Sequence, residues 1–177
     1  QILSQLEDQD KNRISAHFRV SADKQSIRIV SDSGRELSRL EIGSNILNFE
    51  LNNNGTMMAV SVSDLRGTLL IYDVKTLKIT TKVALKRFPR FLEFSADNRF
   101  LIVGDEHTAD IIRIDLENNH QHSLGLPLLP LAIMIGEEPG ELLVRAEREV
   151  MKIQLDPLKL IERNARIEFT FGEETIL

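Results

Sequence analysis

The sequence predicts an all-β fold made of about four repeats of four antiparallel strands. Turns that contain an aspartate follow apolar strands in steps of 41, 42 and 41 residues, at Asp32, Asp73, Asp115 and Asp156. A second acidic series keeps the same steps, at Asp23, Asp64, Glu106 and Glu147. Polar turns earlier in the units form a third marker, at 52–55, 95–98 and 136–140. Four strands in about 40 residues is the spacing of a propeller blade. The sequence therefore predicts a β-propeller segment.

The runs between these turns have the composition of strands. In the second unit we expect strands at 46–51, 57–62, 68–72 and 79–85. In the third we expect them at 91–94, 100–103, 110–114 and 122–126. Short β-rich runs between turn residues are typical of antiparallel sheets. A β-sandwich is the alternative fold, but a sandwich would not repeat its turn residues at a constant period.

The chain is expected to be one propeller segment, 1–177. Its blades cover about 1–43, 44–86, 87–127 and 128–168, and residues 169–177 begin a further strand. The first unit is weak at its start, where residues 1–6 fit a strand or a short helix. Four blades rarely close a ring, and the last strand of an open ring exposes an edge. We therefore expect either a part of a larger propeller or two copies that pair to complete one.

Composition excludes several classes of function. The net charge of −5 and the pI near 5.4 give no basic footprint for binding nucleic acid alone. The absence of cysteine excludes disulfides and thiolate metal sites. The longest apolar stretch, 126–135, is broken by Pro127 and Pro130 and is too short to span a bilayer, so no membrane contact is expected. Neither a Rossmann nor a P-loop pattern occurs, and no cofactor is expected.

Two histidine-containing motifs are candidates for a metal or catalytic site. His120 and His122 alternate, so on a strand they would face one side, but two ligands do not complete a metal site. We interpret them as a polar surface turn. The Asp105-Glu106-His107 cluster is half of a general-base arrangement without a nucleophile. We interpret this cluster, and the four aspartates that recur in the turns, as turn chemistry.

One cluster of basic residues has aromatic neighbours. It comprises Lys82, Lys86, Arg87 and Arg90, with Phe88 and Phe91 interleaved. Basic and aromatic side chains together suit a phosphate-contacting or partner-docking patch. The alternative is a solvated face of like charges, with Phe91 and Phe94 in the core.

Several motifs resemble known propeller repeats. Residues 95–103 (SADNRFLIV) resemble the S-P-D-G-x-x-L-x-V core of WD-repeat and YVTN-type propellers. Residues 88–91 (FPRF) resemble the G-P-R-x start of YVTN repeats, and 70–73 (LIYD) resemble the strand that closes a WD repeat. The chain lacks tryptophan and the Gly-His pair of WD repeats. The hydrogen-bond network of that family is thus absent, and apolar packing must stabilise the blades.

A narrower resemblance covers residues 58–169. The motifs at 83–87, 103–105, 112–116 and 146–149 are similar to those of the non-catalytic WD-repeat subunit of tRNA (guanine-N7) methyltransferase. In that family an arginine in the last motif helps to dock the catalytic subunit, which implies a partner contact for Arg148. The chain departs from the family where Leu126 replaces a histidine, and its last repeat does not end in I-R.

The expected function is therefore that of a non-catalytic scaffold that binds a protein partner. The candidate contact residues are Arg148, Lys86, Arg87 and Arg90. RNA would be reached only through the partner, such as a tRNA-modifying methyltransferase. The alternatives are a YVTN-type ligand-binding or hydrolytic propeller and a purely structural region of a larger protein. A cytoplasmic or nuclear location is favoured; a signal removed upstream of Gln1 would instead mean the periplasm.

Overall fold

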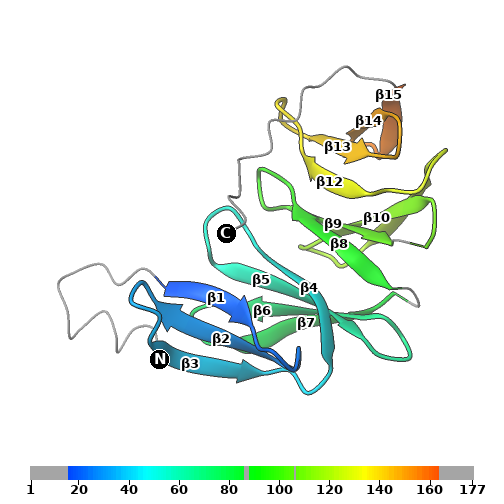
Figure 1. Ribbon diagram of the computed structural model, residues 1–177. Helices are drawn as coiled ribbons and strands as arrows, with labels where there is room; N and C mark the ends of the chain where they lie inside the picture. Colours follow the sequence, from blue (N-terminus) through cyan, green and yellow to red (C-terminus); the bar gives the residue numbers. More distant parts are fainter. Residues whose placement is uncertain (1–15, 86–87, 106, 164–177) are drawn as a thin grey trace.

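The computed structural model describes residues 16–85, 88–105 and 107–163, which form four antiparallel β-sheets (Figure 1). Sheet 1 consists of β1 (Ala16–Val20), β2 (Ser26–Ser31) and β3 (Glu36–Glu41). Sheet 2 consists of β4 (Asn45–Leu51), β5 (Met57–Ser63), β6 (Thr68–Asp73) and β7 (Lys78–Ala84). Sheet 3 consists of β8 (Pro89–Phe94), β9 (Phe100–Asp105), β10 (Asp110–Asp115) and β11 (Gln121–Gly125). Sheet 4 consists of β12 (Ala132–Ile135), β13 (Glu141–Arg145), β14 (Val150–Gln154) and β15 (Lys159–Arg163). No helix in these ranges is long and apolar enough to cross a membrane.

The prediction of an all-β fold is confirmed, with four strands in each of sheets 2, 3 and 4 and three described strands in sheet 1. Each sheet is a meander in which strands pair in chain order. In sheets 2 and 3 no strand end differs from the expected one by more than two residues. Such agreement follows from the turn residues, whose conformations end one strand and start the next. Residues 1–6, which fit a strand or a short helix, and the further strand expected at 169–177 lie outside the described residues.

The sheets are arranged as the blades of a partial propeller. The first strands of successive sheets, β4, β8 and β12, lie next to one another, and the last strands, β7, β11 and β15, form the opposite edges. Figure 1 shows the sheets following one another along a curved path. Connections between sheets therefore run from an outer edge to the next inner strand.

The core consists of three apolar clusters, each between two neighbouring sheets. Met58 and Val60 of β5 face sheet 1, whereas Ala59 between them faces sheet 3. Phe100 and Ile102 of β9 likewise face sheet 4. Central strands that are buried on both faces have continuous apolar runs instead of alternating polar residues. This explains the sequences MMAVSV and FLIV in β5 and β9.

Neutral hydrogen bonds fasten sheet 2 to sheet 3. Asn53, in the turn between β4 and β5, donates through its side-chain amide to the carbonyls of Ser95 (3.2 Å) and Ala96 (3.1 Å). Its backbone N–H donates to Oδ1 of Asn98 at 3.0 Å. Asn98 has a positive φ of 59°, a conformation that asparagine tolerates better than most residues. The polar turns of the two sheets are thus joined directly.

Charged side chains fasten sheet 3 to sheet 4. Arg113 of β10 is only 7% exposed and donates to the carbonyl of Leu155 and to Asp156 Oδ1. The guanidinium groups of Arg113 and Arg99 both lie over the ring of Phe100, 4.5 and 4.6 Å from its centroid. The cation–π contacts thus lie within sheet 3 and position the two arginines, and the bonds to Leu155 and Asp156 join sheet 3 to sheet 4.

The sequence predicts that all four recurrent aspartates organise their own turns, and this prediction is wrong for Asp156. Asp73 does organise its own turn, because it accepts hydrogen bonds from the N–H and the hydroxyl of Thr76. Asp156 instead pairs with Arg113 at 3.1 Å and with Arg99 at 3.5 Å. Asp115 does both, accepting from the N–H of Glu117 and from Arg99. Of these three positions only Asp156 connects sheets, because arginines from sheet 3 reach it, whereas Asp115 and Arg99 both belong to sheet 3.

Removing the buried arginine should weaken the contact between sheets 3 and 4. We expect Arg113→Ala to lower the free energy of unfolding by about 2–4 kcal/mol, because it removes the donor to the carbonyl of the buried Leu155 and uncovers Phe100. Urea unfolding measures the difference. Arg19→Ala is the control, since Arg19 is exposed and forms no ion pair in the described ranges. Equal stability of the two variants would contradict the role given to Arg113.

Candidate partner-binding site

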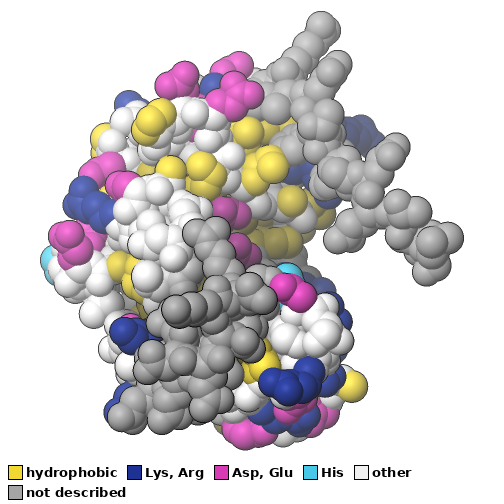
Figure 2. Space-filling view, turned by 90° about the vertical axis from the view of Figure 1, so that its left-hand side faces the viewer, with side chains coloured by type: hydrophobic (Ala, Val, Ile, Leu, Met, Phe, Trp, Pro, Cys, Tyr) yellow, Lys and Arg dark blue, Asp and Glu magenta, His cyan; other side chains and the backbone are white. Residues whose placement is uncertain are grey.

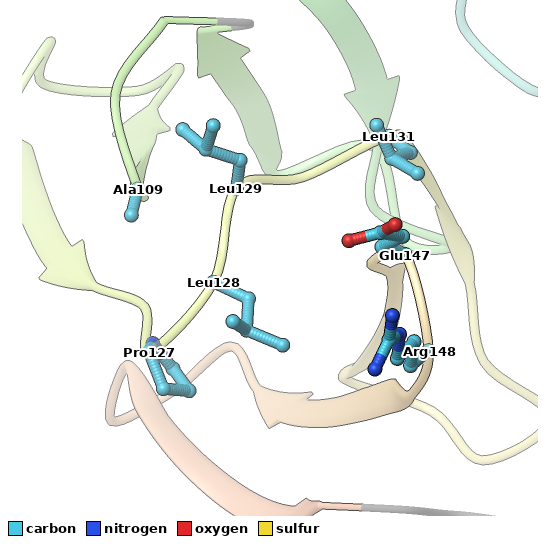
Figure 3. Close-up of a pocket in the computed structure, with 7 residues that line it drawn as sticks. All are labelled: Ala109, Pro127, Leu128, Leu129, Leu131, Glu147 and Arg148. Atoms are coloured by element: carbon cyan, nitrogen blue, oxygen red, sulfur yellow. The ribbon is translucent and has the colours of Figure 1, made fainter.

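A pocket of about 630 Å³ lies where three connections of sheets 3 and 4 meet (Figure 3). The turn between β9 and β10 supplies Ala109, and the connection between β11 and β12 supplies four apolar residues. The turn between β13 and β14 supplies two charged ones. The lining is Ala109, Pro127, Leu128, Leu129, Leu131, Glu147 and Arg148. The pocket is therefore apolar along one wall and charged along the other.

The apolar wall is exposed to solvent. The exposed fractions of Leu128, Leu129 and Leu131 are 38%, 48% and 47%. Figure 2 shows hydrophobic side chains exposed on the upper part of the molecule, with acidic and basic side chains among them. Single exposed leucines are common, but three that line one pocket are typical of a binding surface.

The loop that carries the leucines is held at both ends. The N–H of Leu126 donates to the carbonyl of Ala109 at 2.7 Å, and the N–H of Leu131 donates to the carbonyl of Arg145 at 2.8 Å. Pro127 and Pro130 restrict φ between these anchors. The leucine side chains are thus presented on a backbone with little freedom to lose when a ligand binds.

The charged wall consists of Glu147 and Arg148. Both side chains are exposed. In Figure 3 they lie across the pocket from Leu128 and Leu129. Neither forms an ion pair within the described part of the chain, whereas the next residue, Glu149, pairs with Arg163 at 3.0 Å. The rim of the pocket therefore carries two charges that a ligand can contact.

The position of Glu147 differs from that of its counterpart in sheet 2. Asp64, one of the same acidic series, accepts hydrogen bonds from the backbone N–H groups of Arg66 and Thr68 and so organises its turn. Glu147 makes no such bond in the described part of the chain and lines the pocket instead. Glu147 therefore does not organise its turn in the way that Asp64 does.

The four predicted contact residues have different positions. Arg148 lines the pocket. Arg90 lies in β8, where its carbonyl accepts a hydrogen bond from Asn48, and it does not line the pocket. Lys86 and Arg87 lie outside the described residues.

The aromatic residues near the basic cluster divide between core and surface. Phe94 is buried, as predicted, and the partly buried ring of Phe91 lies against Gly104. Phe88 is 48% exposed and meets His107 edge to face, with ring centroids 6.0 Å apart. Lys82 is exposed on β7. The structure therefore does not bring the described members of this cluster to the leucine pocket.

Sequence reasoning missed the leucines. The stretch at 126–135 served only to exclude a membrane span. The signal that could have found them is the arrangement of apolar residues around Pro127 and Pro130, because the prolines keep residues 127–131 out of a strand and leave their side chains on a loop.

The two histidine-containing motifs have local roles. The carboxylate of Asp105 is buried and accepts hydrogen bonds from the backbone N–H groups of Phe88 and His107, at 3.0 and 2.7 Å. The interpretation as turn chemistry is confirmed for this residue, and Glu106 lies outside the described residues. His120 and His122 are both exposed. Among the described residues no group of three or more potential ligands could hold a metal ion.

Two acidic residues on neighbouring inner strands have perturbed titration. Burial raises the pKa of Glu93 on β8 to about 7, and the negative charge of Glu50 on β4 adds to the effect. Burial also raises the pKa of Glu50. Each glutamate sits between apolar neighbours in a strand that faces another sheet, which is why its charged form is disfavoured.

This pKa has a consequence for stability. A carboxyl whose pKa is higher in the folded than in the unfolded protein lowers the free energy of unfolding as pH rises from about 4.5 to about 7. We therefore expect Glu93→Gln to be more stable than the natural chain above pH 7, by roughly 1–3 kcal/mol because the half-buried side chain keeps some hydration. The difference should vanish below about pH 4. Urea unfolding across pH measures it, and a gap that is constant with pH would contradict the assignment.

Comparison with known proteins identifies the fold. No family model matches the chain, and no curated protein matches it. Among solved structures, hydrazine synthase from Kuenenia stuttgartiensis matches with a TM-score of 0.59 and 15% sequence identity, over 67% of this chain and 35% of that one. The fold is that of a partial β-propeller. The chain spans about a third of the matched protein, and 1151 solved chains match altogether, so the likeness concerns a widely used architecture.

Proposed function

We propose that this chain is a non-catalytic β-propeller scaffold that binds a protein partner through the leucine pocket. The observation that supports the proposal is the combination of three exposed leucines on an anchored loop with Arg148 at the rim. Exposed apolar side chains that line one pocket lose their contact with water when a partner covers them, which is worth about 1.5–3 kcal/mol for a fully buried leucine.

The construction of the loop favours binding in a second way. Its two prolines and two anchoring hydrogen bonds reduce the conformational entropy that association would remove. Charges at the rim of an interface contribute mainly to the choice of partner. A fitting partner therefore has apolar side chains for the leucine wall and a carboxylate opposite Arg148.

The resemblance to the WD-repeat subunit of tRNA (guanine-N7) methyltransferase suggests the partner. The residue that this resemblance nominates for docking is Arg148, and Arg148 is also the arginine that lines the pocket. The proposed partner is accordingly a methyltransferase catalytic subunit, and tRNA would be contacted through that subunit. The net charge of −5 agrees with a scaffold that does not grip RNA alone.

Substitutions in the pocket should separate binding from folding. We expect Leu129→Asp to weaken binding by about tenfold or more, because it puts a charge on the apolar wall. Arg148→Glu should weaken binding by a similar factor, because it places like charges opposite each other. Isothermal titration of the full chain against the catalytic subunit of tRNA (guanine-N7) methyltransferase from the same organism measures both.

Two matched controls are available on the same chain. Leu65 is a fully exposed leucine in the turn between β5 and β6, outside the pocket lining, so Leu65→Asp should bind like the natural chain. Arg19→Glu is the corresponding control for Arg148→Glu. A complex that forms equally well with Leu129→Asp would remove the pocket from the interface. Failure of the natural chain to bind the subunit would remove the methyltransferase assignment.

A further inference from the structure

The outer edge of sheet 3 differs from those of the other three sheets. The edge strands β3, β7 and β15 all contain charged residues, and their pairing with the neighbouring strand contains a register shift. Strand β11 has the sequence QHSLG, with no lysine, arginine, aspartate or glutamate. Its register with β10 is continuous. Among the described outer edge strands β3, β7, β11 and β15, only β11 combines a regular register with an uncharged sequence.

This difference matters because an edge strand exposes unpaired backbone groups. Such a row of N–H and C=O groups can pair with any extended chain that approaches it. Charged residues and bulges on edge strands prevent that pairing. Three of the four described outer edges carry both devices, so the outer edge that has neither is open to strand addition.

The backbone groups that point outward can be assigned. At one end of the pair, the N–H of Asp115 donates to the carbonyl of His120 at 2.9 Å. At the other end, the N–H of Leu126 donates to the carbonyl of Ala109 at 2.7 Å. Antiparallel ladders alternate, so the even-numbered residues of β11 bond to β10. The odd-numbered residues present their N–H and C=O groups outward: Gln121, Ser123 and Gly125.

The open edge leads to the leucine pocket. Strand β11 ends at Gly125, and the loop with the pocket leucines begins at the next residues. Ala109, which pairs with Leu126 at the end of the ladder, itself lines the pocket. An extended chain that followed β11 to its end would therefore arrive at the apolar wall.

We propose that β11 is a strand-addition site, at which an extended segment of the protein partner pairs with the outward backbone groups of β11 and inserts an apolar side chain into the leucine pocket. This inference rests on the proposed function and specifies its mode of binding. About five residues of the segment pair with the edge, and the residues beyond them reach the pocket. Main-chain hydrogen bonds supply affinity, and the pocket supplies the choice of side chain.

A second copy of the chain fits this site less well than a partner segment does. If two β11 strands paired antiparallel about a two-fold axis, the end of one would lie beside the start of the other. The leucine pocket would then meet the polar turn Glu117–His120 of the second copy, and its apolar wall would stay uncovered. A segment of a different protein can satisfy the edge and the pocket together.

Proline substitution tests the backbone pairing. Ser123→Pro removes one outward N–H without removing a bond to β10, and edge strands tolerate proline at such positions. We expect Ser123→Pro to weaken binding of the methyltransferase catalytic subunit roughly tenfold, since a hydrogen bond is lost and the ring obstructs the added strand. Ser123→Ala keeps the N–H and should bind like the natural chain. Gln121→Pro is the second variant, and circular dichroism and thermal unfolding verify that each variant folds.

The outcomes separate this inference from the proposed function. Loss of binding in Leu129→Asp with full binding in both proline variants would overturn strand addition and leave the pocket as the site. If the natural chain does not bind the catalytic subunit, a display library of random 12-residue peptides becomes the probe. Selected peptides that lose binding to Ser123→Pro but not to Ser123→Ala would support strand addition. Selection of no such peptide would overturn it, as would a dimer of the natural chain that Ser123→Pro dissociates.

Discussion

The architecture depends on strands that are apolar on both faces. A four-stranded sheet with such central strands cannot stand alone in water, because each face must be covered by another sheet. Met58 and Ala59, adjacent in β5, belong to two different clusters on opposite sides of sheet 2. Repetition of this arrangement stacks the sheets side by side and leaves the connections at the ends of the strands as the exposed parts. The candidate site is built from three of those connections.

The sequence predicted the parts of the structure that depend on local chemistry. Strand positions in sheets 2 and 3 were predicted to within two residues, because turn residues such as those at 52–55 and 95–98 act over a few neighbours. The contact between Arg113 and Asp156 was not predicted, since the two residues are 43 positions apart and meet only after the sheets have stacked. The periodic spacing predicts that Asp156 organises its own turn, as Asp73 does. In the folded chain Asp156 instead pairs with arginines of sheet 3.

The candidate site was predicted only in part, for a related reason. Arg148 was nominated through a family resemblance and does line the pocket. The leucines and Glu147 were missed because exposure is a property of the folded chain. The sequence alone does not distinguish a leucine on an exposed loop from a leucine in a buried strand. The raised pKa of Glu93 likewise depends on a neighbouring sheet that the local sequence does not reveal.

The contact between sheets 2 and 3 is made by neutral groups, whereas the contact between sheets 3 and 4 includes charged ones. The amide of Asn53 joins sheets 2 and 3 through neutral hydrogen bonds, whose strength hardly changes with dissolved ions. Sheets 3 and 4 are joined partly by Arg99 and Asp156, both about half exposed, and such ion pairs weaken as salt screens them. The leucine pocket also lies between sheets 3 and 4, but at the opposite ends of their strands. Ionic strength therefore acts on the contact between sheets 3 and 4 as well as on the charged rim of the pocket, and a buffer chosen for a binding measurement also sets the strength of that contact.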